Sequence, residues 1–218
     1  VFGIEREVQE VVKTENYGLY FALFNFSFLL NILLDFGITN FNNKNIAQNN
    51  HLITKHFSSI LVLKLMLGVA FMVVTLLAGI LLGYNSDQIH LLAMMGLNQF
   101  LAFMIMYLRS NLAGLHLFAT DSIISVLDRT LMIIFCSILL WGNVLDHPMT
   151  IDLFVYTQTF SYLLTTIITL FIVMRKAKFT RLKWNYPFFI LILKKSLPFA
   201  ILVLLMTFYN RVDAVMLE

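Results

Sequence analysis

The residues of this chain that could perform chemistry are charged side chains placed inside long apolar runs. Arg211 and Asp213 stand two positions apart near the end of the run 198–217. On a helix, residues two apart point about 200° away from each other, so these two side chains cannot pair. Each costs up to about 2.5–3.5 kcal/mol in hydrocarbon unless it finds another partner or water. Such charges form transport sites or structural ion pairs, and we favour a transport site here.

Two further charges lie in the first two apolar runs. Lys64 is the only charge within the run 58–83, and Asp35 lies near the end of the run 17–38. Asp35 follows Tyr17 by 18 residues, about 27 Å along a helix, which predicts a position near the cytoplasmic rim of the membrane. Two interpretations of Lys64 stay open: its ammonium group extends to that interface, or it pairs with Asp35 at a similar depth.

Uncharged polar residues recur at helical spacing in several of the apolar runs. Asn31 belongs to a row with a period of four that also holds Ser27, Asp35 and Thr39. The row is either a hydrogen-bonded seam between helices or one wall of an aqueous path. Further polar residues interrupt two other runs, namely Asn98, Gln99, Gln158, Ser161, Thr165 and Thr169. A compact bundle without a cavity would rarely need all of these polar faces, so they favour a cavity.

The sequence contains no recognisable reaction or metal-binding signature. It has no HExxH, Walker or GxSxG motif, and its five histidines are scattered through loops and helix ends. The single cysteine, Cys136, lies inside an apolar run, where packing is its expected role. We therefore expect a transporter rather than an enzyme, with no catalytic residues, no metal and no cofactor.

The composition indicates the surroundings in which these residues must be positioned. Of 218 residues, 60% are hydrophobic and only 12% are charged, whereas soluble domains carry about 25% charged residues. Such a chain has too few charges to cover a water-soluble surface. This argues against a soluble enzyme, a disordered tail and a nucleic-acid-binding protein, so no nucleic-acid partner is expected.

About six runs are long enough to cross a membrane, because a spanning helix needs about 20 mostly apolar residues. The runs are long and do not alternate, so the expected fold is all-α, a polytopic membrane helical bundle in one domain over residues 1–218. The expected helices are 17–38, 58–83, 88–108, 129–145, 150–174 and 198–217.

Two of the expected helices have polar or amphipathic residues just before their apolar runs. The helix 129–145 is short and has an alternative start near Ser122. Pro198 suits the first turn of the last helix, after an amphipathic lead-in at 187–195. The chain begins at Val1 rather than at Met, and it stops just after an apolar run, which predicts a piece of a longer protein.

The basic residues are distributed unevenly between the two sides of the expected bundle. The connections 39–57, 109–128 and 175–197, together with Arg129 at a helix end, hold eleven of the fifteen Lys and Arg residues. The opposite connections hold Arg6 and Lys13 and seven acids. Since cytoplasmic loops carry the excess of Lys and Arg, the basic side is predicted to be cytoplasmic.

Short motifs at both ends of the chain carry a family resemblance. The first helix opens with Asn-Tyr-Gly-Leu-Tyr at 16–20 and closes with Leu-Asp-Phe-Gly-Ile at 34–38, followed by Asn-Ile-Ala at 45–47. The last helix opens with Ser-Leu-Pro-Phe-Ala at 196–200 and ends with Asn-Arg-Val-Asp-Ala-Val-Met-Leu at 210–217. This pattern resembles the Wzx-type polysaccharide-biosynthesis flippases of the MATE-like superfamily of multidrug, oligosaccharidyl-lipid and polysaccharide exporters.

The resemblance implies an architecture and a function. Such proteins have two six-helix lobes around a central cavity, and this chain would form one lobe, with the first helix and the second lobe absent. They move undecaprenyl-pyrophosphate-linked oligosaccharides across the bacterial inner membrane for surface polysaccharides such as O-antigen. Arg211, and after it Lys64, would meet the pyrophosphate, Asp213 or Asp35 would orient those cations or respond to a coupling ion, and Asn31 would line the path. Expected partners are the lipid-linked oligosaccharide, membrane lipids, coupling H⁺ or Na⁺ and the polysaccharide polymerase machinery.

Three other functions stay open at this point. A cation-coupled multidrug exporter of the same superfamily would favour acids deep in its cavity, whereas the deep charges here are mixed. A polytopic membrane enzyme acting on lipid-linked sugars would need an acid, base or metal cluster on a loop. The loops offer only Asp121 and Asp128 beside Arg129, which we expect to serve helix ends. The third alternative is a non-catalytic scaffold subunit.

Overall fold

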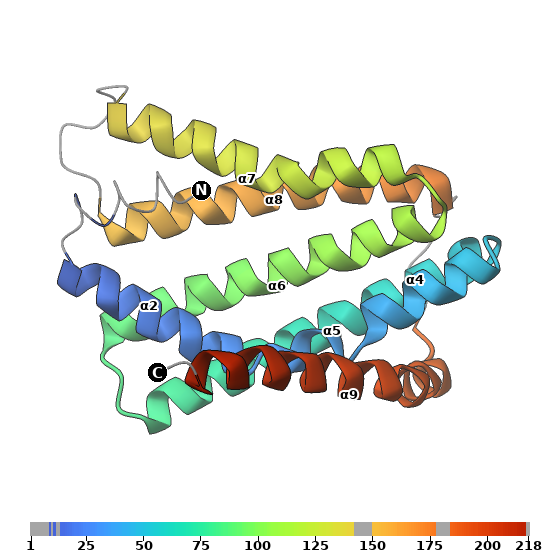
Figure 1. The fold of residues 1–218 in the computed structure, drawn as a ribbon, viewed down its shortest axis with the longest axis horizontal. Coiled ribbons are helices and arrows are strands. Elements are labelled where there is room, and N and C mark those ends of the chain that lie inside the picture. The colour runs from blue at the N-terminus through green and yellow to red at the C-terminus, as the bar shows by residue number, and fades with distance from the viewer. Residues whose placement is uncertain (1–8, 10, 12–13, 142–149, 178–183, 217–218) are drawn as a thin grey trace.

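The computed structural model of this chain is a bundle of long helices that run roughly side by side (Figure 1). It describes the backbone of residues 9, 11, 14–141, 150–177 and 184–216, and the side chains of residues 9, 11, 17–141, 150–177 and 184–206. Within those ranges the structure contains helices and no strand. The predicted all-α polytopic fold class is therefore confirmed.

The helices are longer than the apolar runs that predict them. Their bounds are α2 Thr14–Leu29, α3 Ile32–Asp35, α4 Ile38–Gln48, α5 Leu52–Leu81, α6 Ser86–Gly114, α7 Phe118–Trp141, α8 Ile151–Ala177 and α9 Tyr186–Met216. In the described part, α5, α6, α7, α8 and α9 are each long and apolar enough to cross a membrane. A sixth span forms if the bent pair of Tyr17–Leu29 and Ile32–Gln48 crosses as one unit. The protein is thus a multi-pass membrane protein.

The helix ends differ from the expected ones chiefly on the basic side. Residues 39–57 were expected to be a connection, but α4 and α5 occupy all of them except 49–51. Likewise α6 continues to Gly114 and α7 begins at Phe118, inside the expected connection 109–128. A helix of 30 residues, such as α5, is about 45 Å long and exceeds the roughly 30 Å of hydrocarbon. Its polar turns therefore stay helical outside the apolar layer, where hydropathy does not detect them.

The earlier start of α7 changes the position of Arg129. The expected helix began at this residue, whereas in the structure Arg129 is eleven residues beyond Phe118, the first residue of α7. That is about 16 Å along the helix, near the middle of the span. Arg129 therefore leaves the set of basic residues at the helix ends. The described helix ends beside the other basic connections still lie together, since α4, α6 and α8 end, and α5, α7 and α9 begin, at the same end of the bundle (Figure 1).

The first span is broken at its centre by two residues in the left-handed region. Phe36 has φ 45° and Gly37 has φ 72°. Just before them the span also bends, because the segments Tyr17–Leu29 and Ile32–Gln48 meet at 48°. The carboxylate of Asp35 accepts a hydrogen bond from the backbone N–H of Thr39, 3.2 Å away, and so caps the first turn of α4. The expected single helix 17–38 is thus a bent span that continues to Gln48, and Asp35 lies at its break rather than near its end.

We predict that Gly37→Ala disrupts this break. A Cβ at Gly37 would lie 2.7 Å from the carbonyl oxygen of Ser196 and 2.8 Å from the carbonyl carbon of Phe199, and neither backbone can give way easily. Gly83→Ala is the matched control, because Gly83 has φ 79° but nothing within 4 Å of its Cβ position. Both variants carry the cost of a left-handed alanine, about 1–2 kcal/mol, so the additional loss reports the crossing with α9. Fluorescence-detected gel filtration after heating should show Gly37→Ala melting several degrees below Gly83→Ala, and equal melting would contradict the close crossing.

The helix α6 is the centre of the bundle, and it contacts α2, α4, α5, α7 and α8. Glycines allow α5 and α6 to approach closely: the ring of Phe100 covers Gly68, and a Leu92 methyl lies 2.7 Å from the Cβ position of Gly79. Small residues at such contacts are typical of helix packing in membranes. Buried side chains form two clusters, one toward the basic end around Tyr107 and Phe57 and the other toward the opposite end around Leu92 and Met95.

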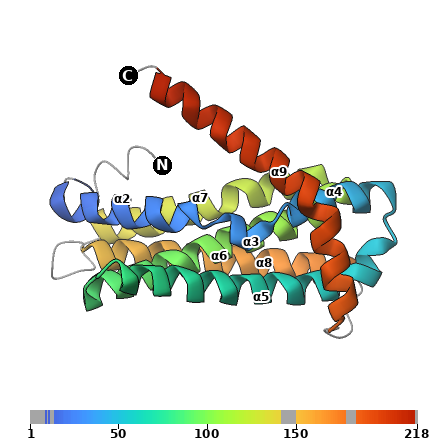
Figure 2. The same ribbon diagram turned by 90° about the horizontal axis from the view of Figure 1, so that it is seen from below.

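The last helix, α9, is bent and leaves the bundle (Figure 2). Pro198 lies in its interior, twelve residues after Tyr186, instead of in its first turn as expected. A proline inside a helix removes one backbone hydrogen bond and clashes with the preceding turn, which bends the helix. The expected lead-in 187–195 is therefore the first arm of one bent helix. Beyond Pro198 the residues 201–206 are exposed and apolar.

Candidate functional site

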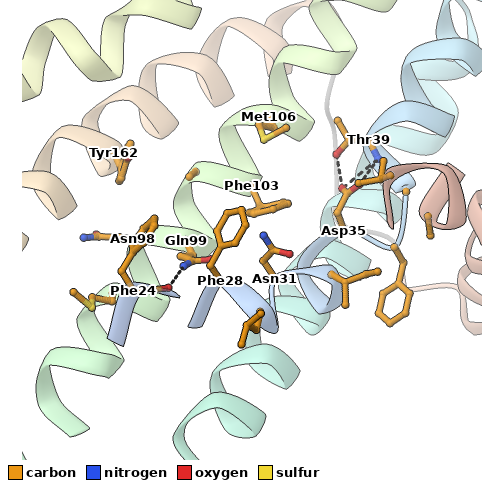
Figure 3. Close-up of a pocket in the computed structure, with 18 of the residues that line it drawn as sticks. Phe24, Phe28, Asn31, Asp35, Thr39, Asn98, Gln99, Phe103, Met106 and Tyr162 are labelled. Atoms are coloured by element: carbon orange, nitrogen blue, oxygen red, sulfur yellow. Dashed lines mark hydrogen bonds between the residues drawn. The ribbon is translucent and has the colours of Figure 1, made fainter. Parts of the chain in front are cut away.

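A cavity of about 720 Å³ lies at the break of the first span (Figure 3). Its walls come from α2, α3, α4, α6, α7, α8 and α9, and they are mostly apolar and aromatic, with Phe24, Phe28 and Phe103 among them. Polar side chains from five of these helices, and from Asn31 just before α3, also line it, namely Asn31, Asp35, Thr39, Asn40, Asn98, Gln99, Arg129, Gln158 and Tyr162. An apolar pocket with a few convergent polar groups is the usual form of a small-molecule site.

The carboxylate of Asp35 lies on the wall of the cavity and is fully engaged. It forms an ion pair with the ammonium of Lys64 and accepts a hydrogen bond from the hydroxyl of Thr39, besides capping α4. The Lys64 ammonium also donates to the carbonyl oxygen of Leu34 at 3.1 Å. Of the two interpretations left open for Lys64, pairing with Asp35 is therefore the one that the structure shows.

Lys64 does not reach the cavity itself. Only 2% of its side chain is exposed, against 15% for Asp35, and Lys64 is not among the lining residues. It lies twelve residues beyond Leu52, about 18 Å along α5, and is packed near the ring of Tyr107. Lys64 thus fixes and neutralises a carboxylate that faces the cavity, and Asp35 adds no free negative charge to the wall.

The row expected on the first span divides between two environments. Asn31 and Thr39 line the cavity with Asp35, whereas Ser27 is fully buried and accepts a hydrogen bond from the amide of Gln99 at 2.8 Å. In Figure 3 the side chain of Asn31 is drawn between those of Gln99 and Asp35. Both interpretations of the row are therefore present, with a hydrogen-bonded seam at Ser27 and a cavity wall from Asn31 onward.

Two amide oxygens on α6 are buried at the cavity wall without a partner. Asn98 donates to the side-chain oxygen of Gln158 at 3.2 Å, and Gln99 donates to Ser27, but their own oxygens accept nothing from the described residues. These residues are only 4% and 6% exposed. A buried acceptor without a donor costs about 1–3 kcal/mol. These oxygens are covered in the structure, so a ligand that brings hydroxyl or N–H donors would pair with them after a shift of the amide side chains.

We predict that Gln99→Leu removes a ligand contact at little cost in folding. Leucine fills a similar volume and eliminates the unpaired oxygen, while Ser27 keeps its hydrogen bond to the carbonyl of Phe24 at 3.0 Å. In the complete protein the melting temperature should change by no more than a few degrees, and transport should fall several-fold. Thr75→Val removes another unpartnered buried oxygen, on a residue that does not line the cavity, so it is the control and should leave transport unchanged. Equal activity of both variants would contradict a ligand role for Gln99.

Arg129 is the cation on the cavity wall that the sequence did not single out. Its side chain is 52% exposed, and its one ion pair within the described residues is a long 3.6 Å contact with Asp128. Asp121, by contrast, pairs with Arg109 at 2.7 Å and does serve the first turn of α7, as expected. The alternative helix start near Ser122 could have identified Arg129, because it places this residue inside the helix and not at its end. A half-exposed guanidinium in mid-span can bind an anionic group that enters the cavity.

Arg211 and Asp213 lie in the last turns of α9, where the structure gives the helix but their side chains lie outside the described residues. Their roles stay predictions. Within the described part of the chain, no group of three or more His, Cys, Asp or Glu side chains is placed to hold a metal ion.

Comparison with known protein families assigns the chain to one of them. The family model described as polysaccharide biosynthesis protein matches residues 8–218. The chain belongs to this family. The resemblance seen in the motifs at 16–20, 34–38 and 196–217 is thereby confirmed over nearly the whole sequence. The search of curated proteins and the search of solved structures each found no match.

Membership of the polysaccharide biosynthesis protein family indicates the kind of process in which the cavity takes part. A member of this family acts in polysaccharide synthesis or export, and this one is built as a multi-pass helical bundle. The cavity combines donors, acceptors and one half-exposed cation with apolar walls. These are groups that can bind a substrate with both hydroxyls and a phosphate.

Proposed function

We propose that this protein is a flippase that moves an undecaprenyl-pyrophosphate-linked oligosaccharide across the bacterial inner membrane for surface polysaccharide synthesis. The observation that carries the proposal is the cavity wall, where a half-exposed Arg129 and the amide side chains of Asn98 and Gln99 line one space. A pyrophosphate needs a cation and a glycan needs hydrogen-bond acceptors for its hydroxyls. Neither crosses about 30 Å of hydrocarbon unaided.

The charges on the cavity wall favour a flippase for an anionic substrate over a multidrug exporter. An exporter of organic cations needs a free carboxylate in its path, but Asp35, the acid on this wall, is neutralised by Lys64. The half-exposed charge that remains is positive and favours an anionic substrate. Asp35 is then suited to respond to coupling H⁺ or Na⁺, because loss of its charge would release Lys64.

We propose a transporter rather than an enzyme on the same grounds. The polar groups on the cavity wall are amides, hydroxyls, a paired acid and a guanidinium. This set can bind and release a substrate, but it does not place a base beside a nucleophile. The alternating access of such a transporter would place the same cavity first on one side of the membrane and then on the other.

Photo-crosslinking tests the proposal in cells that make the glycan. A benzophenone amino acid at Phe103, on the cavity wall, should capture the lipid-linked oligosaccharide as a glycan-positive adduct. The same group at Ile138, which is 49% exposed on α7 and does not line the cavity, is the control. Excess organic cation should leave the adduct at Phe103 unchanged. Equal labelling at both positions, or competition by organic cations, would contradict the proposed substrate.

A further inference from the structure

A second pocket lies at the basic end of the bundle, away from the substrate cavity. It has a volume of about 430 Å³ and is formed where the beginnings of α5 and α9 contact each other. Its lining residues are Lys55, His56, Ser59, Trp184, Asn185 and Phe188, and we call it the basic pocket. The ring of His56 stacks on Phe188 at 4.7 Å and 11°, so the two helices are held together at its base.

Among the described residues, the charges that act on the basic pocket are all positive. Lys55, His51 and Lys195 are each close enough to His56 for their charge to act on its ring, and no carboxylate acts on it in the same way. The described ion pairs join other residues, and none includes Lys55 or Lys195. A concave site with cations and no counter-charge attracts an anion.

A serine hydroxyl makes the basic pocket more than a charged surface. Ser59 is only 5% exposed and lines the pocket, and its hydroxyl has no hydrogen-bond partner among the described residues. Ser59 is thus a donor held at the wall of a positively charged space.

The aromatic residues at the pocket mouth place it at the level of lipid headgroups. Trp184 lines the pocket and is 68% exposed, and Tyr186 two residues later is 64% exposed. Exposed Trp and Tyr at the end of a membrane span mark the interface between hydrocarbon and water. Basic pockets between spanning helices at this level suit the phosphate of an anionic lipid.

We infer that the basic pocket binds the phosphate of an anionic phospholipid headgroup. Lys55 supplies charge, the hydroxyl of Ser59 donates a hydrogen bond, and the rings of Trp184 and Phe188 contact the glycerol and the first acyl carbons. Lipid bound here would join the ends of α5 and α9. The inference does not depend on the substrate proposed for the other cavity.

Native mass spectrometry of the complete protein in detergent tests this inference, with phosphatidylglycerol titrated against phosphatidylcholine. The wild type should bind phosphatidylglycerol in preference. Ser59→Ala keeps every charge and should weaken that binding about tenfold, the loss expected for one hydrogen bond to a charged group. Lys55→Gln should weaken it at least as much. Lys176→Gln, an exposed lysine at the end of α8 outside the pocket, is the charge-matched control and should bind normally.

Two results would overturn the inference. If Lys55→Gln and Lys176→Gln weaken binding equally while Ser59→Ala has no effect, the lipid is attracted by the basic end in general. If inorganic phosphate at millimolar concentration displaces phosphatidylglycerol completely, the site recognises free phosphate and not a lipid. If Ser59→Ala weakens phosphatidylglycerol binding and inorganic phosphate does not displace the lipid, the pocket is a headgroup site.

Discussion

Arg129→Ala in the complete protein should abolish polysaccharide export while the protein remains folded. The half-exposed guanidinium is the cation on the described cavity wall, and its 3.6 Å contact with Asp128 contributes little to folding. Loss of a charge that binds a charged partner costs about 2–5 kcal/mol, a factor of roughly 30 or more in binding. Surface polysaccharide per cell, divided by the amount of protein in the membrane, measures the effect.

Two variants give this prediction its controls. Arg129→Lys keeps the charge but loses the two-pronged geometry, so it should retain part of the export. Arg175→Ala removes an arginine that stacks on Phe171 at 4.2 Å in the last turn of α8, and it should export normally. Normal export by Arg129→Ala would remove the main reason for an anionic substrate in this cavity.

Lys64→Ala should produce the largest loss of stability among single substitutions in the described part of the chain. It leaves the Asp35 carboxylate beside the cavity without its cation and empties a position that is only 2% exposed. Breaking a buried ion pair by removing one partner costs about 3–5 kcal/mol. Melting of the purified complete protein, followed by fluorescence-detected gel filtration, should fall by many degrees.

A double variant separates the ion pair from the packing. Lys64→Met with Asp35→Asn removes both charges together, and the asparagine oxygen can still accept the bond from the Thr39 backbone. Because a buried pair and its neutral replacement are often similar in stability, this variant should recover most of the loss seen in Lys64→Ala. A Lys64→Ala protein that melts like the wild type would show that Asp35 does not need its partner.

The sequence predicts the fold class and the nature of the cavity because both depend on polar residues in apolar runs. Asn31, Asn98 and Gln158 lie far apart in the chain and were expected to mark polar faces, and the structure brings all three to one space. The same reasoning predicts too many cavity residues on α8. Thr165 and Thr169 are fully buried and bond to the backbone of their own helix, so they do not line the cavity.

The helix ends and the break could not be predicted, for physical reasons. Hydropathy detects the apolar layer, whereas a helix continues past it for as long as its backbone bonds are satisfied. A charge such as Arg129 lowers the local hydropathy, so the apolar run stops there although the helix continues. The break at Phe36 and Gly37 depends on the close passage of α9, a contact between residues more than 150 positions apart in the chain.

The most direct test of the proposed function is flipping in vesicles made with the purified complete protein. A labelled undecaprenyl-pyrophosphate-linked oligosaccharide is incorporated in both leaflets, and a glycosidase that cannot cross the membrane is added outside. We predict that nearly all of the glycan becomes cleavable with the wild-type protein, and that only the outer-leaflet share is cleaved with Arg129→Ala. If wild-type vesicles protect the inner-leaflet glycan as well as protein-free vesicles do, the protein is not a flippase for this substrate.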